Sequence, residues 1–552
     1  MNTKFIFVSG GVISGLGKGL CAASLGLLLQ SRGYTVNPLK CENYLNQDSG
    51  TINPIDHGDP FLCEDGLEAD MDLGVYERLL DKNMGKNNFV TKGQIFKRIL
   101  EKERSMSYNG ETVEDIPHVL NEIVERIKES GRGYDFCIIE IGGTAGEYQN
   151  VLYYEASRYM KTKNPKDVLN VHVSYMPIPK HLGEPKTKPT QMTVRILMSM
   201  GIHPDFLILR SEANLDTRRR KLLGVKTSIK GENIIVAKDL DNIYRLPLEF
   251  SNQDFDAKVL KEFNLPKKKQ NLNKWKKLIE SIEKPRKRKI AVGIAGKYLS
   301  KNEGDYELTD AYHALIEALK HASWETNIDI DLHLVNVTKK GFEKKLKDLD
   351  TIIVPIGWGK RGVEGKIKSI TFARENKVPY LGLCYGMQLA CVEYARNVVG
   401  LKNANTEEVN PKAEHKIIHS IPFNKKYQVI KGDGVSMRLG AYDCVLKKGT
   451  LAYKIYEKGN QFKDKSKDIV SERHRHRFEF NNEYREILEK QGLIFSGTSP
   501  DDFFVEFIEL PKKTHPFFIA TQGHPEYKSR PGKAHPLFKA LLKAGLKHKR
   551  RK

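Results

Sequence analysis

A cysteine between two glycines is the clearest sign of chemistry in this chain. Cys384 stands in the stretch VPYLGLCYGMQLAC, after an apolar run and before a helix-like one, with Gly382 and Gly386 on either side. Burial requires no flanking glycines, whereas a sharp strand-to-helix turn requires small neighbours and exposes the central side chain at the sheet edge. The amino end of the following helix favours a thiolate. The pattern therefore predicts a nucleophilic cysteine.

A nucleophile needs a base, and the base needs a group that orients it. The stretch TQGHPEY supplies both: His524 follows an apolar run, and Glu526 lies two residues further on. We therefore expect a Cys384–His524–Glu526 triad. The N–H of Tyr385 and a second donor from the glycine-rich turn in VPIGWGKRG, residues 354–362, are expected to face the developing oxyanion, and losing one such donor typically costs about 10²–10³ in rate.

A second reaction centre is predicted near the amino terminus. The stretch SGGVISGLGKGLCAASLGLLLQSRG, residues 9–33, places a glycine-rich turn between an apolar strand and an alanine- and leucine-rich helix. Glycines allow backbone N–H groups to surround phosphate oxygens, the helix N-terminus adds positive potential, and Lys18 adds a full charge. The standard P-loop has a hydroxyl after its lysine, and here that position is Gly19. The turn therefore predicts a phosphate-binding loop that takes its metal ligands from elsewhere.

Two carboxylates are candidates for those ligands. Asp72 lies in EADMDLG, and Glu140 lies at the end of the apolar run FCIIE. The carboxyl ends of strands form the ligand-binding edge of a doubly wound sheet, and Mg²⁺ commonly uses one or two carboxylates together with phosphate oxygens. Taken singly, either residue is equally an ordinary surface carboxylate.

A basic loop follows in GEPKTKPTQ, residues 183–191. Lys186 and Lys188 flank a threonine just before a proline, which restrains the backbone and would hold the two ammonium groups in place. This suits a second phosphate-bearing ligand. A solvated loop is the alternative interpretation.

The elements that position these residues alternate between apolar strands and helical patterns. Such alternation indicates parallel sheets. The sequence predicts an α/β fold with two doubly wound, mainly parallel-sheet domains in tandem. We expect a first domain over residues 1–265, a basic linker with one short helix over 266–288, a second domain over 289–545 and a basic tail over 546–552.

Composition limits the class of protein. The chain has 552 residues, a formal net charge of +22 and seven cysteines without a CxxC pair, which favours a reducing compartment over a disulfide framework or a zinc site. We expect no membrane span and no signal peptide. The positive charge suits either nucleic-acid binding or an enzyme with several polyphosphate ligands.

Nine motifs in a fixed order give the chain a close resemblance to the CTP synthase family. They are GGVISGLGKG, DGLEADMDLGVYER, EIGGTAGE, KTKPTQ, GLCYGMQ, NANTEE, MRLG, ERHRHRFE and QGHPE. The resemblance covers nearly the whole chain, and KTKPTQ and ERHRHRFE are specific to this family among amidotransferases.

The resemblance implies a three-step reaction. Glutamine is hydrolysed through a thioester on Cys384, ATP with Mg²⁺ phosphorylates O4 of UTP, and ammonia carried through an internal channel displaces the phosphate to give CTP. It also implies activation by GTP, feedback inhibition by CTP, a homotetramer that can form filaments, and a cytoplasmic location. It implies neither membrane nor nucleic-acid partners.

The resemblance further implies roles for individual residues. Those implied for ATP are Gly15, Leu16, Gly17, Lys18, Gly19, Leu20, Asp72, Lys238, Asp239 and Leu240. Asp72 and Glu140 are implied as metal ligands. Those implied for UTP or CTP are Ser14, Lys40, Glu147, Tyr148, Gln149, Lys186, Thr187, Lys188, Pro189, Thr190, Gln191 and Lys221. Those implied for glutamine are Gly357, Tyr385, Gly386, Met387, Gln388, Glu408 and Arg475, with the arginine on its α-carboxylate and Glu408 on its ammonium group.

The chain departs from the family pattern at several positions. Ile356 replaces a glycine beside the expected oxyanion donor, Tyr385 a leucine, and Gly523 an aromatic residue. A β-branched residue resists positive φ angles, which predicts that glutamine turnover is slowed or its activation altered. KCENYLNQDSG and Glu147-Tyr148-Gln149 also differ, which extends this expectation to CTP inhibition and nucleotide preference.

Two other functions remain alternatives. One is a catalytically altered assembly or nucleic-acid-binding protein, favoured by the charge of +22 and the substituted loop. The other is an enzyme that uses free ammonia only. The presence of every expected catalytic side chain argues against the first.

Overall fold

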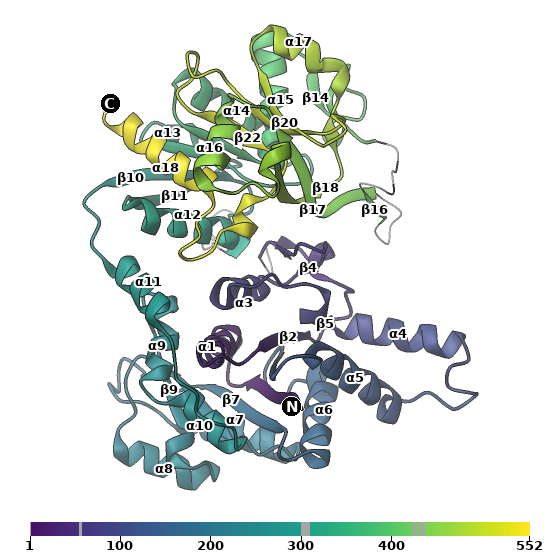
Figure 1. Ribbon diagram of the computed structural model, residues 1–552, viewed down its shortest axis with the longest axis vertical. Helices are drawn as coiled ribbons and strands as arrows, with labels where there is room; N and C mark the ends of the chain where they lie inside the picture. The colour runs from purple at the N-terminus through teal and green to yellow at the C-terminus, as the bar shows by residue number, and fades with distance from the viewer. Residues whose placement is uncertain are drawn as a thin grey trace. The chain divides into compact units, whose positions relative to one another are not determined.

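The computed structural model describes residues 2–54, 58–299, 310–421, 423, 425, 428–430 and 436–552. These form two compact units (Figure 1). Unit 1 contains Met1–Thr51 and Asp72–Glu283, and unit 2 contains Ile52–Met71 and Lys284–Lys552. The sequence analysis placed Ile52–Met71 in the first domain by position along the chain, whereas in the structure this segment packs with unit 2.

Unit 1 is built on a seven-stranded sheet in the order β5-β2-β6-β1-β7-β8-β9. Every neighbouring pair is parallel. Because helices cover both faces, the strands are buried along nearly their whole length rather than on alternate residues. The strands are β1 Lys4–Gly10, β2 Val36–Glu42, β5 Phe89–Thr91, β6 Phe136–Ile141, β7 Val168–Tyr175, β8 Phe206–Ser211 and β9 Ile234–Lys238.

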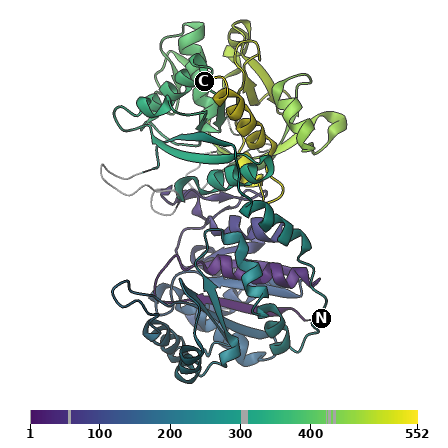
Figure 2. The same cartoon turned by 90° about the vertical axis from the view of Figure 1, so that its left-hand side faces the viewer.

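The helices of unit 1 form a layer on each face of this sheet (Figures 1 and 2). Helices α1, α9 and α10 cover one face, and α5, α6 and α7 cover the other. The helices are α1 Lys18–Ser31, α3 Asp72–Leu80, α4 Lys92–Arg104, α5 Leu120–Gly131, α6 Val151–Lys163, α7 Lys188–Ser199, α8 Thr217–Thr227, α9 Leu246–Ser251, α10 Phe255–Glu262 and α11 Asn273–Glu283.

The strand order reverses at β1, which makes its carboxyl end a topological switch point. The chain runs from β1 towards β2 on one side and later crosses to β7 on the other. Ligands bind beyond the carboxyl ends of strands at such a point. The glycine-rich turn after β1 lies at this edge.

Unit 2 contains a ten-stranded sheet in the order β11-β10-β12-β13-β22-β21-β20-β17-β16, with β18 paired to β17. Its first five strands are parallel, and the others are antiparallel. The strands are β10 Lys289–Gly296, β11 Asp329–Asn336, β12 Thr351–Val354, β13 Tyr380–Leu383, β16 Val429–Ile430, β17 Ser436–Leu446, β18 Ile469–His476, β20 Ile494–Thr498, β21 Val505–Glu509 and β22 Phe518–Thr521.

Two small sheets complete unit 2. One contains β14 Ala404–Thr406, β15 His415–His419 and β19 Glu479–Phe480, and the other pairs β3 Phe61–Leu62 with β4 Glu68–Ala69 in the segment Ile52–Met71. The predicted α/β class with two doubly wound sheets is confirmed. The antiparallel strands were not predicted, because β17 mixes buried and half-buried residues instead of presenting a continuous apolar run.

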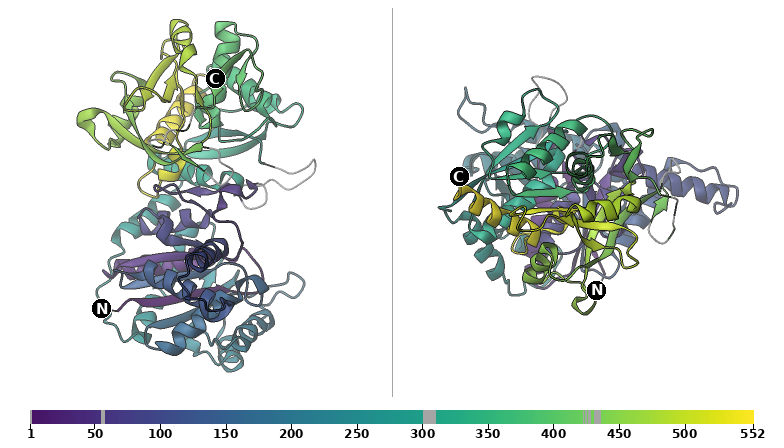
Figure 3. Two further views of the ribbon diagram at one scale, coloured as in Figure 1. Left: turned by 90° about the vertical axis from the view of Figure 1, so that its right-hand side faces the viewer. Right: turned by 90° about the horizontal axis from the view of Figure 1, so that it is seen from above.

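The helices of unit 2 cover both faces of the large sheet. Helices α14 and α15 share one apolar core, whereas α12, α16 and α18 share the other. Helix α18, yellow in Figure 3, packs against α12. The helices are α12 His313–Thr326, α13 Glu343–Leu346, α14 Val363–Glu375, α15 Tyr385–Tyr394, α16 Leu451–Gly459, α17 Arg485–Lys490 and α18 Pro536–Lys549. Within the described residues of both units, no helix has the length and hydropathy needed to cross a membrane.

Candidate active site

Cys384 occupies a strained turn between β13 and α15. Its backbone has φ 51° and ψ −104°, a conformation that costs a non-glycine residue on the order of 1–3 kcal/mol. A Cβ at Gly382 would lie 2.7 Å from the Tyr380 hydroxyl, and one at Gly386 would lie 2.0 Å from the Val354 carbonyl oxygen. The two glycines are therefore required by the turn, as their spacing in the sequence indicated.

The base comes from a neighbouring strand of the same sheet. β13 pairs in parallel with β22, so the chain that leaves β22 brings His524 to the edge where Cys384 lies. His524 is fully buried, and its Nδ1 lies 2.7 Å from Oε1 of Glu526. Its Nε2 makes no hydrogen bond to any described residue, so we treat its interaction with the thiol as electrostatic. Burial lowers the pKa of His524, but the charges of Glu526 and a Cys384 thiolate outweigh burial and raise it to about 10.

This raised pKa predicts a pH dependence of stability. The ordinary pKa of histidine is 6.5, so His524 stabilises the fold fully below about pH 6.5 and loses this contribution as the pH rises through about 10. We expect His524→Asn to flatten the decline of unfolding free energy between pH 6.5 and 10. Denaturant titrations of both proteins across this range measure the difference. Parallel curves would contradict the assigned charge state.

Two backbone donors share a small cavity with the cysteine. The cavity is lined by Gly357, Trp358, Cys384, Tyr385, Gln388, Glu408, His476, Arg477 and Phe478. The N–H of Gly357 makes no hydrogen bond within the described chain. The N–H of Tyr385 is at the first position of α15, where no intrahelical acceptor exists. The cavity therefore combines a nucleophile with two N–H groups suited to an oxyanion.

The cavity is nearly closed in this conformation. Its free volume is about 10 Å³, room for roughly one water molecule. The N–H of Gly359 donates to Oε1 of Glu408 at 2.7 Å, and the Tyr385 hydroxyl donates to the Gly359 carbonyl oxygen at 3.3 Å. Entry of an amino-acid ligand therefore requires these side chains to move.

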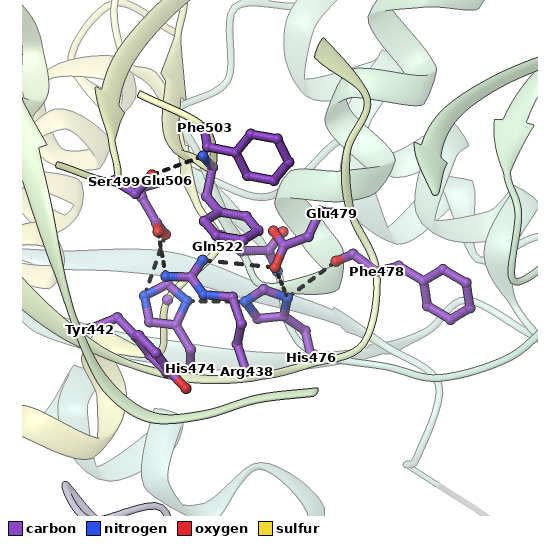
Figure 4. Close-up of polar contacts among 12 residues, drawn as sticks. Arg438, Tyr442, His474, His476, Phe478, Glu479, Ser499, Phe503, Glu506 and Gln522 are labelled. Carbon is purple, nitrogen blue, oxygen red and sulfur yellow. Dashed lines mark hydrogen bonds and ion pairs between the residues drawn. The ribbon is translucent and has the colours of Figure 1, made fainter. Parts of the chain in front are cut away.

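A buried polar network, part of which is drawn in Figure 4, adjoins the cavity. Gln522 donates to Sγ of Cys384 at 3.6 Å and accepts from Gln388 at 3.2 Å. Gln388 also donates to the Phe478 carbonyl oxygen, which lies 3.1 Å from Nδ1 of His476. This chain of contacts fixes side chains of α15 and of the residues after β22 around the sulfur atom.

The network continues into a group of buried charges, also drawn in Figure 4. The Arg438 guanidinium lies 2.7 Å from a Glu506 oxygen and packs against the rings of Tyr442 and Phe504. Glu479 lies 3.8 Å from Arg438, and burial raises its pKa to about 8. A paired, buried charge cluster of this kind fixes side-chain geometry more than it adds stability.

The segment Ile52–Met71 binds the side chain that the sequence analysis assigned to glutamine. Nε of Arg475 donates to Glu68 at 2.6 Å, and its Nη1 lies 3.3 Å from Asp59. Arg475 is not among the residues that line the cavity, whereas Arg477 lines it, and the charge of Arg477 acts on Glu408. The carbonyl oxygen of Arg475 lies 3.7 Å from Sγ of Cys384, whereas Arg477, two residues further along, is one of the residues that line the cavity.

In unit 1, the two predicted metal ligands come together around a lysine. Nζ of Lys40 lies 2.7 Å from Oδ2 of Asp72 and 2.8 Å from Oε1 of Glu140, its register partner on the adjacent strand. Glu42 adds a third carboxylate at 3.3 Å. A Cβ at Gly19 would lie 3.1 Å from the Glu140 carboxylate. A side chain at position 19, in the first turn of α1, would therefore press on the Glu140 carboxylate.

The phosphate-loop lysine lies in the same place. Lys18 begins α1 behind Gly17, which has φ 74°, and its Nζ donates to the Gly143 carbonyl oxygen at 2.6 Å. Burial and the nearby charge of Lys40 lower its pKa. A Cβ at Gly11 would overlap Thr193 of α7, so the loop packs directly on the helix that begins with the KTKPTQ run.

The other predicted nucleotide residues lie around the same sheet edge. In the KTKPTQ run, Thr187, Thr190 and Gln191 are buried, whereas Lys188 is exposed. Lys238, Asp239 and Leu240 lie at the end of β9, and Glu147 to Gln149 lie in the turn after β6. Lys221 lies on the exposed side of α8. Ser14 and Gly15 are exposed in the glycine loop, and Leu16 and Leu20 flank Lys18.

Comparison with known proteins gives matches to both halves of the chain. The family model described as CTP synthase N-terminus matches residues 4–265, and that described as glutamine amidotransferase class-I matches residues 307–544. The CTP synthase of Methanocaldococcus jannaschii is 45% identical over 99% of each chain, and that of Carboxydothermus hydrogenoformans 46% over 99% of each. The chain belongs to the CTP synthase family. The glutaminase domain of Trypanosoma brucei CTPS with bound acivicin is 32% identical and covers 47% of this chain and 94% of that one, with a TM-score of 0.40.

The substitutions that set this CTP synthase family member apart are accommodated locally. Ile356 is buried and adopts no positive φ. A Cβ at Gly523 would lie 2.7 Å from Cβ of Glu472, so the aromatic residue of the family pattern would not fit here without movement. Tyr385 packs its ring beside the ammonium groups of Lys297 and Lys366 at 5.5 and 5.4 Å.

Sequence reasoning missed several residues of the two sites. Glu42 ends a buried strand as Glu140 does, and this shared position could have identified it. The Tyr76 hydroxyl donates to Glu140 at 2.9 Å, and Lys366 binds the carbonyl oxygens of the loop after β12. Both come from helices whose sequences carry no such signal.

Proposed function

We propose that the protein makes CTP from UTP, ATP and glutamine. The observation that carries the proposal is a cavity lined by Cys384, Gly357 and Tyr385, with the His524–Glu526 pair close enough for the charge of Cys384 to act on His524. The other unit of the chain gathers Lys18, Lys40 and two carboxylates. The 45% identity to a CTP synthase over 99% of the chain supports the same reaction.

The glutaminase step follows from the geometry of unit 2. The Cys384 thiolate attacks the amide carbon of glutamine, and the N–H groups of Gly357 and Tyr385 stabilise the oxyanion. His524 gives its proton to the amide nitrogen, which leaves as ammonia. The acyl group remains bound to Cys384 as a thioester. His524 then takes a proton from water, which attacks the thioester carbon and releases glutamate and the thiol.

The nucleotide step is assigned to the edge of the unit 1 sheet. The loop from Gly15 to Leu20 would hold ATP phosphates, and the KTKPTQ run would hold UTP or, in feedback inhibition, CTP. The paired carboxylates at Asp72 and Glu140, with the open approach at Gly19, fit Mg²⁺ bound to ATP, because this ion is commonly held by one or two carboxylates and phosphate oxygens. Bound there, Mg²⁺ would neutralise phosphate charge. Lys40 and Lys18 bring further positive charge to the transferred phosphoryl group.

Absorbance-monitored conversion of UTP to CTP with ATP and Mg²⁺ tests the proposal. Glutamine and ammonium are compared as nitrogen sources, each with and without GTP, which we propose as an activator. We expect turnover with both. Absence of turnover with either source, together with salt-dependent retention on DNA, would favour the non-catalytic alternative, and turnover with ammonium alone would favour the ammonia-only alternative.

We assign the α-carboxylate of glutamine to Arg477 rather than to Arg475. Losing a charge-assisted hydrogen-bond pair costs about 1.5–3 kcal/mol, so we expect Arg477→Met to raise the KM for glutamine about 10- to 100-fold with little change in kcat. Arg475→Met serves as the comparison. It should lower Tm by removing the ion pair with Glu68 and leave KM nearly unchanged. A larger KM effect at Arg475 would reverse the assignment.

The proposal includes a cytoplasmic homotetramer that can form filaments. All seven cysteines are unpaired, which suits a reducing compartment. Leu45, Leu100 and Met106 are 61–69% exposed on and beside α4, and exposed apolar surface of this kind favours contact with another chain. Sedimentation of the protein with and without nucleotides tests the assembly state.

A further inference from the structure

A fully buried lysine lies beside the loop that contributes one oxyanion donor. Lys366, in the first turn of α14, is 0% exposed, and its Nζ donates to the carbonyl oxygens of Pro355 at 2.6 Å and Ile356 at 2.9 Å. The ring of Tyr385 lies 5.4 Å from it, the charges of Lys297 and Cys384 act on it, and no described carboxylate forms an ion pair with it. Burial lowers the pKa of Lys366 well below its ordinary value. A buried ammonium without a carboxylate partner is costly, so the two carbonyl bonds need an explanation.

The bond to Ile356 determines where the next N–H group points. In a trans peptide the C=O and N–H groups point in opposite directions. Because the Ile356 carbonyl oxygen faces Lys366, the Gly357 N–H faces away from it. A flipped peptide would turn its N–H group towards Nζ of Lys366, which is itself a donor. The hydrogen bond from Lys366 to the Ile356 carbonyl oxygen therefore favours one of the two peptide orientations.

The same ammonium group also explains the residue type at position 357. A Cβ on Gly357 would lie 2.9 Å from Nζ of Lys366 and 2.9 Å from Cε of Lys297. Any side chain there would displace the lysine from the loop carbonyl groups. Gly357 and Lys366 are thus fitted to each other, while Gly357 also lines the cavity of Cys384.

We propose that Lys366 is a positioning residue for glutamine hydrolysis, and that it holds the Ile356–Gly357 peptide with its N–H available to the oxyanion. The inference rests on the glutaminase function proposed above. Lys366 touches neither the thiol nor the substrate in this assignment. It acts through Gly357.

Lys366→Met in the full-length enzyme tests the proposal, since methionine keeps the length of the side chain and removes its donors. The control is Lys368→Met on the same helix, where the lysine is exposed and pairs with Glu343 at 3.3 Å. Three rates are measured for each protein: glutamate release from glutamine, CTP formation from ammonia, and alkylation of Cys384 by iodoacetamide, which forms no oxyanion. Lys366→Gln, which can still donate to one carbonyl oxygen, provides a second variant if the first does not fold.

We expect Lys366→Met to lower kcat for glutamine hydrolysis about 10²-fold, the effect of losing one oxyanion donor. KM, ammonia-dependent turnover and Cys384 alkylation should remain close to wild type, Lys366→Gln should lie between, and Lys368→Met should match wild type. An unchanged kcat overturns the proposal. So does a parallel loss of all three rates, which would indicate a structural role. Failure of the glutaminase function itself is distinguished by the wild type, which would then release no glutamate.

Discussion

Replacing Cys384 with alanine is expected to abolish glutamine-dependent CTP formation and to leave ammonia-dependent CTP formation intact. Sγ of Cys384 is the only protein atom in the assigned mechanism that bonds covalently to glutamine. Its loss should therefore reduce glutamine-dependent CTP formation by at least about 10³-fold. Free ammonia bypasses the thioester and needs only the nucleotide site in unit 1. Parallel assays with saturating glutamine and with ammonium chloride measure the two activities.

Cys391→Ala provides the matched control for this experiment. Cys391 is fully buried on the same helix α15, is unpaired, and is not among the residues that line the cavity. We expect this variant to keep both activities, apart from a modest loss of stability from the smaller side chain. Equal loss of glutamine- and ammonia-dependent activity in Cys384→Ala would contradict the division of labour between the two units.

Replacing Lys18 with alanine is expected to abolish CTP formation from both nitrogen sources. Its ammonium group is buried at the start of α1, beside Lys40 and the carboxylates of Asp72 and Glu140, where it would contact transferred phosphate. Phosphorylation of UTP precedes the use of either nitrogen source, so we expect a loss of about 10²-fold or more with glutamine and with ammonium. Glutamate release in the absence of nucleotides should persist.

Lys18→Met tests whether the loss of activity comes from the missing charge of Lys18 or from a loss of stability, and Lys226→Ala is the control at an exposed lysine. Methionine retains the apolar stem that packs in the loop, so Lys18→Met should match Lys18→Ala in activity while keeping more stability. Lys226 is exposed at the end of α8, and its replacement should change neither activity. Ammonia-dependent turnover that survives in Lys18→Ala would refute the role of this lysine.

At the nucleotide site, the sequence predicted the parts but not their contacts. The apolar strand runs and the glycine spacing predicted a parallel sheet with a loop at its carboxyl edge, and the structure confirms the sheet. That Lys40 would bridge Asp72 and Glu140 depended on the register of β2 against β6. Register is set by pairing between distant segments, so no local pattern contains it.

At the glutamine site, the family resemblance assigned Arg475 to the α-carboxylate of glutamine, and this assignment stays a prediction. Arg473, Arg475 and Arg477 are spaced by two residues and are indistinguishable by period. β18 ends at His476, so Arg477 lies just beyond the strand and lines the cavity, whereas the side chain of Arg475 pairs with Glu68. That partner comes from a segment more than 400 residues away, and only the folded chain brings it there.

The sequence by itself determined the family, the α/β class and the nucleophile in its glycine turn, because local sterics and hydrophobic periodicity act over a few residues. The tertiary structure alone decided that Ile52–Met71 packs with unit 2, that Arg477 lines the cavity of Cys384, and that Lys366 binds the loop beside it. These outcomes depend on which buried charged groups are paired in the folded chain. Their partners are close in three dimensions but distant in the sequence, so no local pattern identifies them.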